Sequence, residues 1–326
     1  MVMASDAQPP RTTWVLTDGK TGMVSQAMGL AEAVGFEIVN KTIRPGFPWR
    51  LLPASVWPSG VQGLSPRSER IDGPPPDLVI SCGRHAVGPA LWLKHTHGDK
   101  CFLVHVQHPR ARVDRFDLVV APTHDELSGP NVIEISGSLH GVTEAKLEAA
   151  AARFGSRYDS APHPLIAVLI GGSNSVYTFD DKTVERLING LTHISEMHGA
   201  SLLVTMSRRT DEAARAKLHA GLAGISAEIW DGTGENPYHA YLALADAIVV
   251  TCDSVNMISE ACSTGKPVYI IPLTGGENSK FADFHNALIA AGKARFFDGR
   301  LDSWSYTPLD DTARAAEEVR RRMGIE

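Results

Sequence analysis

Strand-like and helix-like patterns alternate along both halves of this 326-residue sequence. They predict an α/β protein of two Rossmann-like, doubly wound domains facing each other across a cleft. Short apolar runs bounded by turn residues indicate strands buried in parallel sheets. The segment Gly155–Pro164 has no periodicity and is typical of a linker. We therefore expect an N-terminal domain over residues 12–155 and a C-terminal domain over residues 164–308.

In the N-terminal domain, apolar runs predict strands at Thr13–Thr17, Glu37–Thr42, Asp77–Ser81, Cys101–Gln107, Leu118–Ala121 and Val132–Ile135. Helical periodicity predicts helices at Ser25–Ala33, Arg84–Lys94 and Glu144–Phe154. The stretch Pro45–Pro76 is rich in proline, glycine and serine, so we expect a loop region there.

In the C-terminal domain, strands are expected at Leu165–Ile170, Ser201–Met206, Ala227–Trp230, Ala247–Thr251 and Val268–Ile271. Helices are expected at Asp180–His198, Asp211–Ala220, Pro237–Ala245, Ser254–Thr264 and Lys280–Ala291. A last helix within residues 309–326, at Leu309–Met323, is free to pack on either domain.

Composition narrows the class of protein. A net charge of −6 and a pI near 6.1 argue against nucleic-acid binding. The four cysteines (Cys82, Cys101, Cys252 and Cys262) show no metal-ligand spacing and are expected to be buried free thiols. Residues 1–10 lack a targeting signal, and no apolar run is long enough to span a bilayer. We expect a cytoplasmic protein, with peripheral membrane association left open.

The stretch Asp246–Pro272 is the most informative part of the sequence. It predicts a buried strand, a polar turn and a helix that begins near Ser254. Because a helix start carries unpaired amides and partial positive charge, it stabilises a diphosphate without a metal ion. Glu260 lies nearly two turns further on, where its carboxylate can accept hydrogen bonds from ribose hydroxyls. The alternative, in which Asp253 and Ser254 only cap the helix, stays open.

Other polar turns follow predicted strands of the C-terminal domain. Gly171–Ser175 matches neither a P-loop nor a dinucleotide-binding fingerprint, which disfavours ATP hydrolysis and nicotinamide binding. Ligands of open α/β sheets bind outside the carboxyl ends of the strands, where this turn lies. Ser207 and Arg208 follow the next strand, and an arginine fork suits phosphate. A ligand-free tight turn and a solvated arginine pair are the alternatives.

The predicted N-terminal domain also collects polar residues at strand ends. Asp18 and Lys20 follow the first strand, Arg84 and His85 the third, and Gln107 and His108 the fourth. His85 can act as a general base near neutral pH, and Asp18 is the competing base. The sequence does not decide between them, and His85 serving only as a loop hydrogen-bonding residue remains the alternative.

These segments together resemble the mitochondrial fission ELM family. The resemblance runs from about Trp14 to Phe297 and rests on blocks in the same order: Trp14–Lys20, Cys82–His85, Gln107–Arg110, Gly171–Asn174, Ser207–Arg209, Trp230–Tyr238, Asp253–Ala261 and Lys280–His285. The family takes its name from a plant protein of the outer mitochondrial surface that recruits a dynamin-related GTPase. A protein partner is one implication of this resemblance.

The layout also resembles glycosyltransferases of the GT-B class, which implies metal-independent, cofactor-free transfer from a nucleotide sugar. By that resemblance Glu260 contacts the ribose. The phosphates are surrounded by Gly171, Gly172, Ser173, Asn174, Ser207, Arg208, Asp253, Ser254, Asn256 and Met257. The catalytic candidates are Asp18 and His85, and the residues expected on the acceptor side are Lys20, Arg84, Gln107 and His108.

Two functional hypotheses follow. The first is an enzyme that transfers a sugar from a nucleotide sugar to an unidentified acceptor. The second is a non-catalytic adaptor that binds a protein partner. Because polar residues are dense at the predicted strand ends, the sequence favours the first hypothesis.

Overall fold

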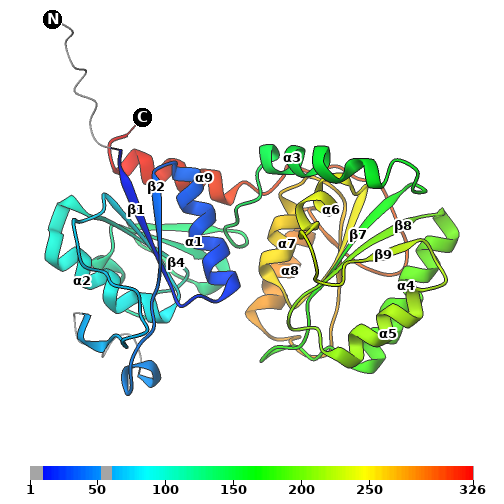
Figure 1. The fold of residues 1–326 in the computed structure, drawn as a ribbon, viewed down its shortest axis with the longest axis horizontal. Helices are drawn as coiled ribbons and strands as arrows, with labels where there is room; N and C mark the ends of the chain where they lie inside the picture. Colours follow the sequence, from blue (N-terminus) through cyan, green and yellow to red (C-terminus); the bar gives the residue numbers. More distant parts are fainter. Residues whose placement is uncertain (1–9, 53–60, 326) are drawn as a thin grey trace, which may run out of the picture. The chain divides into compact units, whose positions relative to one another are not determined.

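A computed structural model describes residues 10–52 and 61–325 of the chain, which forms two compact units. The first unit runs to Gly141 and includes the chain again from Asp311, and the second is Val142–Asp310. Each unit holds a parallel six-stranded sheet covered by helices, which confirms the predicted α/β class with two Rossmann-like parts (Figure 1). The predictions for residues 1–9 and for positions 53–60 of the loop region lie outside the described residues.

The sheet of the first unit has the strand order β2-β1-β3-β4-β5-β6, and all its pairings are parallel. The strands are β1 (Thr12–Thr17), β2 (Glu37–Thr42), β3 (Leu78–Cys82), β4 (Phe102–Val106), β5 (Leu118–Pro122) and β6 (Val132–Ile135). After β2 the chain crosses to the other side of β1 to form β3. The strand order therefore reverses between β1 and β3, and such a switch point is the usual ligand position in an open α/β sheet.

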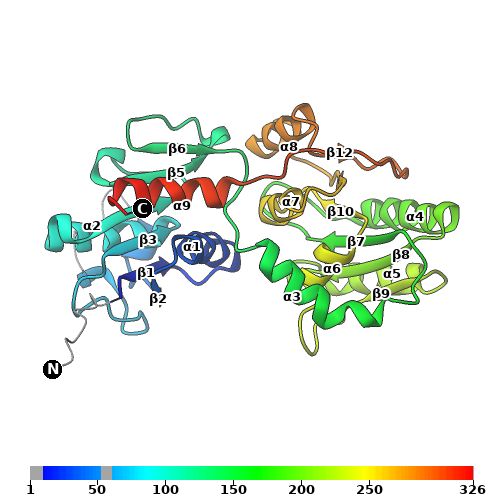
Figure 2. The same ribbon diagram turned by 90° about the horizontal axis from the view of Figure 1, so that it is seen from above.

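Three helices cover the two faces of this sheet: α1 (Thr21–Val34), α2 (Val87–His97) and α9 (Asp311–Arg322). Figures 1 and 2 show α1 and α9 side by side. Leu30 of α1 and Val319 of α9 share one apolar cluster, whereas Leu93 of α2 belongs to a separate cluster. The Asp311 carboxylate accepts hydrogen bonds from the Ser136 and Gly137 amides at 2.8 and 3.1 Å, which fixes the start of α9.

The second unit has the strand order β12-β11-β10-β7-β8-β9, again with parallel pairings. Its strands are β7 (Leu165–Ile170), β8 (Ser201–Met206), β9 (Ala227–Ile229), β10 (Ala247–Thr251), β11 (Val268–Ile271) and β12 (Arg295–Phe296). The first strand of the unit, β7, lies between β8 and β10. Its switch point therefore lies between β7 and β10.

Six helices accompany this sheet: α3 (Glu144–Phe154), α4 (Asp181–His198), α5 (Glu212–Leu222), α6 (Tyr238–Leu244), α7 (Val255–Cys262) and α8 (Lys280–Ala290). Most begin at a residue whose side chain accepts a hydrogen bond from an amide of the first turn. These capping residues are Thr143, Asp180, Asp211, Ser254 and Ser279. The residue at which each of these helices begins therefore follows from its capping side chain.

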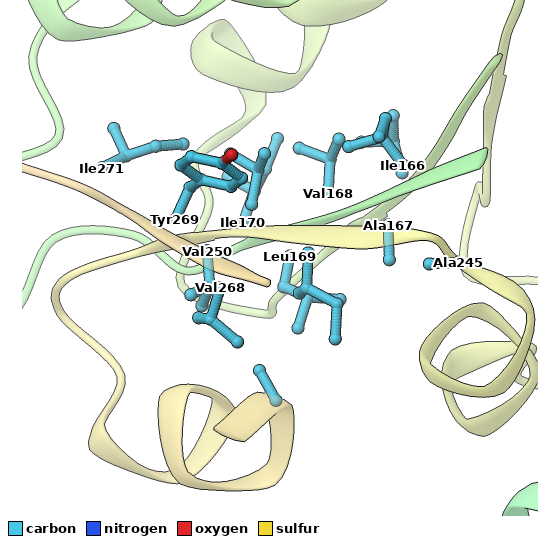
Figure 3. Close-up of a cluster of buried hydrophobic side chains, with 14 of the residues drawn as sticks. Ile166, Ala167, Val168, Leu169, Ile170, Ala245, Val250, Val268, Tyr269 and Ile271 are labelled. Carbon is cyan, nitrogen blue, oxygen red and sulfur yellow. The ribbon is translucent and has the colours of Figure 1, made fainter. Parts of the chain in front are cut away.

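The core of the second unit lies on both faces of its sheet. Alternate residues of β7 point to opposite faces, so Ile166, Val168 and Ile170 lie on one side and Ala167 and Leu169 on the other (Figure 3). All five are fully buried. A strand that is apolar on both faces needs helices above and below it, which explains the continuous apolar run in the sequence.

The structure differs from the sequence-based domain boundaries. Helix α3 packs against α6 and belongs to the second unit, so the chain passes between the units at Gly141, before the predicted linker. The C-terminal helix belongs to the first unit and begins at Asp311. The predicted helix at Arg84–Lys94 is a 3₁₀ turn at Arg84–Ala86 followed by α2.

Two further predictions from the sequence concern the cysteines and membrane-spanning segments. All four cysteines are buried free thiols, as predicted. Within residues 10–52 and 61–325, none of the helices combines the length and the apolar character that a bilayer crossing requires.

Candidate functional site

The candidate site of the second unit lies at the switch point between β7 and β10. Two predicted ligand-binding segments meet there, because Gly171 follows β7 and Asp253 follows β10. The Thr251 hydroxyl accepts a hydrogen bond from the Gly171 amide at 2.7 Å and so joins the two strand ends. The tertiary structure thus brings together two turns that were predicted at the ends of separate strands.

Asp253, predicted as a ligand contact, is buried in the structure. Its side chain is 0% exposed and forms an ion pair with Arg209, with 2.7 Å between the carboxylate and the guanidinium. The carboxylate also accepts a hydrogen bond from the Gly172 amide at 3.1 Å. Burial raises the pKa of Asp253, while a hydrogen bond with the Thr251 side chain, the Arg209 charge and the Gly172 amide act in the opposite direction. Asp253 therefore lies inside the protein, where its carboxylate holds the turn after β7 in place.

The two glycines of this turn are required by close packing. A Cβ atom at Gly171 would lie 2.2 Å from the Asp253 carboxylate, and one at Gly172 would lie 2.2 Å from the backbone oxygen of Arg209. Neither distance is compatible with a side chain. These glycines let the turns after β7, β8 and β10 approach one another, which is a sufficient reason for their presence.

Several residues that were predicted to bind phosphate form their hydrogen bonds with other groups of the protein. The Ser207 hydroxyl donates to the Gly171 carbonyl at 2.9 Å and accepts from the Arg209 amide at 3.1 Å. The Asn174 amide group donates to the Asp253 carbonyl at 3.3 Å, and its oxygen accepts from two amides of its own turn. Ser173 is exposed, and its oxygen accepts from the Phe179 amide at 2.9 Å. Their main effect is to hold the turn rigid.

Helix α7 presents the remaining groups. The Ser254 hydroxyl caps it by accepting a hydrogen bond from the Met257 amide at 3.4 Å. Asn256 and Met257 lie half-buried in its first turn, and Arg208 is exposed on the neighbouring turn after β8. A preformed helix start with an arginine on the neighbouring strand-end turn favours anion binding.

Glu260 lies in α7, half-buried, and its carboxylate is held by a neighbouring helix. The Tyr238 hydroxyl, at the start of α6, donates a hydrogen bond to it at 2.5 Å. Burial and the Glu260 charge raise the pKa of Tyr238 well above its ordinary value, so the phenol keeps its proton. This neutral partner orients the carboxylate.

The first unit brings four predicted residues together at its own switch point, between β1 and β3. The Asp18 carboxylate lies 2.7 Å from the Lys20 ammonium and 3.6 Å from Nδ1 of His85. An Arg84 guanidinium nitrogen lies 3.2 Å from Nε2 of the same imidazole. Burial and Arg84 lower the pKa of His85, against the opposing effect of Asp18. The imidazole is thus neutral near pH 7, as a general base requires.

Gln107 and His108 lie one strand further along the sheet. Gln107 has the left-handed backbone angle φ 79, and its side chain donates to Gln26 at 3.4 Å. Nδ1 of His108 accepts a hydrogen bond from the Arg110 amide at 2.9 Å. Left-handed backbone at a non-glycine residue is costly and is often retained at functional sites. No described contact joins these two residues to the cluster at Asp18.

The sequence did not identify the residues that hold the predicted ligands in place. Arg209 belonged to an arginine pair for which phosphate binding and a solvated surface both stayed open, yet it forms an ion pair with Asp253. Tyr238 was only the last residue of the block Trp230–Tyr238, yet it orients Glu260. Both contacts join separate strand-helix units, so no local sequence pattern encodes them.

A model of the family described as mitochondrial fission ELM1 matches residues 21–323. The "Mitochondrial fission protein ELM1" of Arabidopsis thaliana is 34% identical over 293 residues, which cover 81% of this chain and 67% of the plant protein.

Solved structures show the same fold at low sequence identity. UDP-GlcNAc 2-epimerase from Methanocaldococcus jannaschii is similar with a TM-score of 0.59 and 13% identity, over 95% of this chain and 99% of the epimerase. MurG of Acinetobacter baumannii is similar with a TM-score of 0.50 and 14% identity, over 97% and 96% of the two chains. These neighbours confirm the predicted GT-B-like fold.

Proposed function

This chain belongs to the mitochondrial fission ELM1 family, and from its GT-B-like fold and its second switch point we propose that it binds a nucleotide sugar there. One observation carries the proposal. Glu260 is a half-buried carboxylate whose position in α7 is fixed by the Tyr238 hydroxyl, nearly two turns from the helix start. A carboxylate at that distance suits ribose hydroxyls while the diphosphate lies at the helix start.

The rest of the binding site follows from the contacts around α7. The turn Gly171–Asn174 and Ser207 provide a rigid wall because their hydrogen bonds are internal. Arg208 is exposed and carries the positive charge that a diphosphate requires. The epimerase neighbour is named for UDP-GlcNAc, which makes this compound the first donor to test.

We further propose that the bound sugar is transferred to an acceptor hydroxyl. The acceptor oxygen forms a bond to the anomeric carbon, the bond from that carbon to the diphosphate breaks, and the electron pair leaves with the nucleoside diphosphate. Arg208 and the start of α7 stabilise the departing charge. Asp18 or His85 of the first unit accepts the acceptor's proton.

Titration calorimetry with UDP-GlcNAc and with UDP tests the binding step. Glu260→Gln removes the negative charge at nearly constant shape, and we expect affinity to fall by about tenfold or more. Glu196→Gln, on the exposed side of α4, is the matched control and should bind as the wild type does. Equal affinities of the two variants, or no binding of any nucleotide sugar by the wild type, would rule out this site.

The 34% identity to a plant mitochondrial fission protein favours a second candidate function, a non-catalytic adaptor. In that case the chain binds a dynamin-related GTPase through its outer surface. A pull-down with such a GTPase distinguishes the two functions. Capture that is unchanged by Glu260→Gln and Arg208→Ala, together with no response to nucleotide sugars, supports the adaptor.

A further inference from the structure

The segment that follows β2 in the first unit has an unusual charge composition. Between Lys41 and Glu69 the sequence contains Arg44, Arg50 and Arg67 and no other charged residue. The whole chain carries a net charge of −6, so this concentration of positive charge runs against its overall balance.

The three arginines line one hollow of about 440 Å³, together with Phe47 and Ser65. Its two walls are tied by backbone hydrogen bonds, from the Gly46 amide to the Gly63 carbonyl at 2.8 Å and from the Ser65 amide to the Arg44 carbonyl at 2.9 Å. Residues some twenty positions apart in the sequence therefore line the same hollow. We name this hollow the arginine pocket.

The guanidinium groups of the arginine pocket have no acidic partner within residues 10–52 and 61–325. No ion pair involves Arg44, Arg50 or Arg67, whereas Arg70 pairs with Asp72 at 2.5 Å just outside the pocket. Glu69, the nearest acidic residue in sequence, accepts a hydrogen bond from the Thr42 amide. Three exposed positive charges are thus gathered without a local acidic partner, which leaves their guanidinium groups open to an anion.

Apolar groups flank these charges. Phe47 is 76% exposed and Leu51 is 66% exposed, and both are among the few large hydrophobic side chains of the described residues that face solvent. Exposed apolar side chains beside positive charge suit a ligand that has both an anionic and an apolar part.

We propose that the arginine pocket binds a phosphate or diphosphate group. The planar guanidinium makes two charge-assisted hydrogen bonds to phosphate oxygens, and three such groups can surround one diphosphate. The source of the phosphate is a soluble phosphorylated compound or a lipid headgroup. This anion site goes beyond the proposed nucleotide-sugar site and does not depend on it, because the residues of the two sites belong to different units.

Hydrogen bonds connect the arginine pocket to the cluster around Asp18. The Arg84 guanidinium donates to the Arg50 carbonyl at 3.1 Å and also lies 3.2 Å from the His85 imidazole. The pocket residue Arg50 is therefore joined through Arg84 to His85, one of the two candidate general bases. We assign the phosphate bound in the pocket to the acceptor of the transfer reaction, and this assignment alone rests on the proposed function.

Titration calorimetry of the full chain with inorganic pyrophosphate tests the site. The triple variant Arg44→Gln, Arg50→Gln and Arg67→Gln should lose at least about tenfold in affinity. The variant Arg70→Gln, Arg112→Gln and Arg115→Gln removes the same charge from other exposed positions of the first unit and should bind nearly as the wild type does.

Vesicle co-sedimentation distinguishes the two sources of the phosphate. Binding to phosphatidylcholine vesicles that contain phosphatidic acid, lost on Phe47→Ser with pyrophosphate binding retained, assigns a lipid headgroup. Pyrophosphate binding without vesicle binding assigns a soluble compound. The proposal is overturned if the wild type binds neither probe, or if the two triple variants bind both probes equally. UDP-GlcNAc binding by the arginine-pocket variant reports separately on the nucleotide-sugar site.

Discussion

The two switch points use their polar residues in opposite ways. In the second unit Asp253 is fully buried, and Ser207 and Asn174 are committed to hydrogen bonds within the protein. In the first unit the charged groups gather around one carboxylate, and the Lys20 side chain is 70% exposed. Polar residues after a strand can therefore either build a turn or present reactive groups, and their sequence positions alone do not distinguish these roles.

Helix capping shows the same contrast. Helix α7 begins at Ser254, whose hydroxyl satisfies one of its first amides. Helices α1 and α2, which follow the two switch-point strands of the first unit, have no capping side chain. The strand-end turns of the second unit are thus held by internal hydrogen bonds and a capped helix, whereas the charged cluster of the first unit lies beside helices without a capping side chain. Three predictions test this difference.

The largest effect is expected from Gly172→Ala in the second unit. The new methyl group would meet the backbone of Arg209 at 2.2 Å, so two strand-end turns must separate. Overpacking of this kind costs about 3 kcal/mol, which lowers the melting temperature of a unit of this size by roughly 10 °C. Differential scanning calorimetry of the full chain measures the change.

Gly224→Ala is the control for this experiment, because a Cβ atom there has no neighbour within 4 Å. Its melting temperature should match that of the wild type. If Gly172→Ala also melts at the wild-type temperature, the site of the second unit is not rigid and the contrast between the units is wrong.

An intermediate effect is expected from Tyr238→Phe. The variant removes the hydroxyl that orients Glu260 and preserves the ring. Loss of one hydrogen bond costs about 1 kcal/mol, which corresponds to roughly fivefold weaker UDP-GlcNAc binding. Affinity from titration calorimetry should fall with little change in melting temperature. Tyr306→Phe, which removes a hydroxyl that donates to the Lys266 carbonyl, should leave the affinity unchanged.

The smallest effect is expected for the pKa of His85 in the first unit. The pKa of His85 lies below its ordinary value because of burial and the Arg84 charge, so the imidazole becomes protonated only as the pH falls below the usual range. Arg84→Gln should raise the pKa of His85, and Asp18→Asn should lower it. NMR titration of the His85 ring measures both pKa changes. The ring signals are assigned by comparison with the variant His85→Gln.

These shifts also have a consequence for stability. Because the folded-state pKa of His85 is lowered, its contribution to stability is present above the unfolded-state pKa and is lost as the pH falls through the folded-state value. His105 contributes in the same direction, since burial lowers its pKa to about 3. The same His85 pKa in the wild type, in Arg84→Gln and in Asp18→Asn would contradict the proposed electrostatic cluster.

Much of the fold could be predicted from the sequence because its signals are local. The run Leu165–Ile170 is apolar throughout, and the strand β7 has the same limits. Helix α4 begins after Asp180, whose carboxylate caps it as its residue type suggests, and it ends at Gly199 in the left-handed conformation. The two-residue strand β12 was missed because Arg295 and Phe296 are exposed and too few to form a pattern.

The domain boundaries and the roles of site residues were less predictable. Helix α3 follows the strands of the first unit in sequence but packs against α6, and α9 returns to the first unit after the whole second unit. Asp253 has the residue type of a ligand contact, yet its partner Arg209 comes from a different strand end. Such pairings depend on which segments meet in space.

The sequence by itself determined the α/β class, most strand and helix limits, the buried cysteines and the strand-end positions of the polar turns. Periodicity, capping and turn preferences act over a few residues, so a linear reading recovers them. Only the tertiary structure decided that Asp253 is buried against Arg209, that Tyr238 orients Glu260 and that three arginines share one pocket. The physical reason is that burial and charge pairing depend on contacts between segments far apart in the chain.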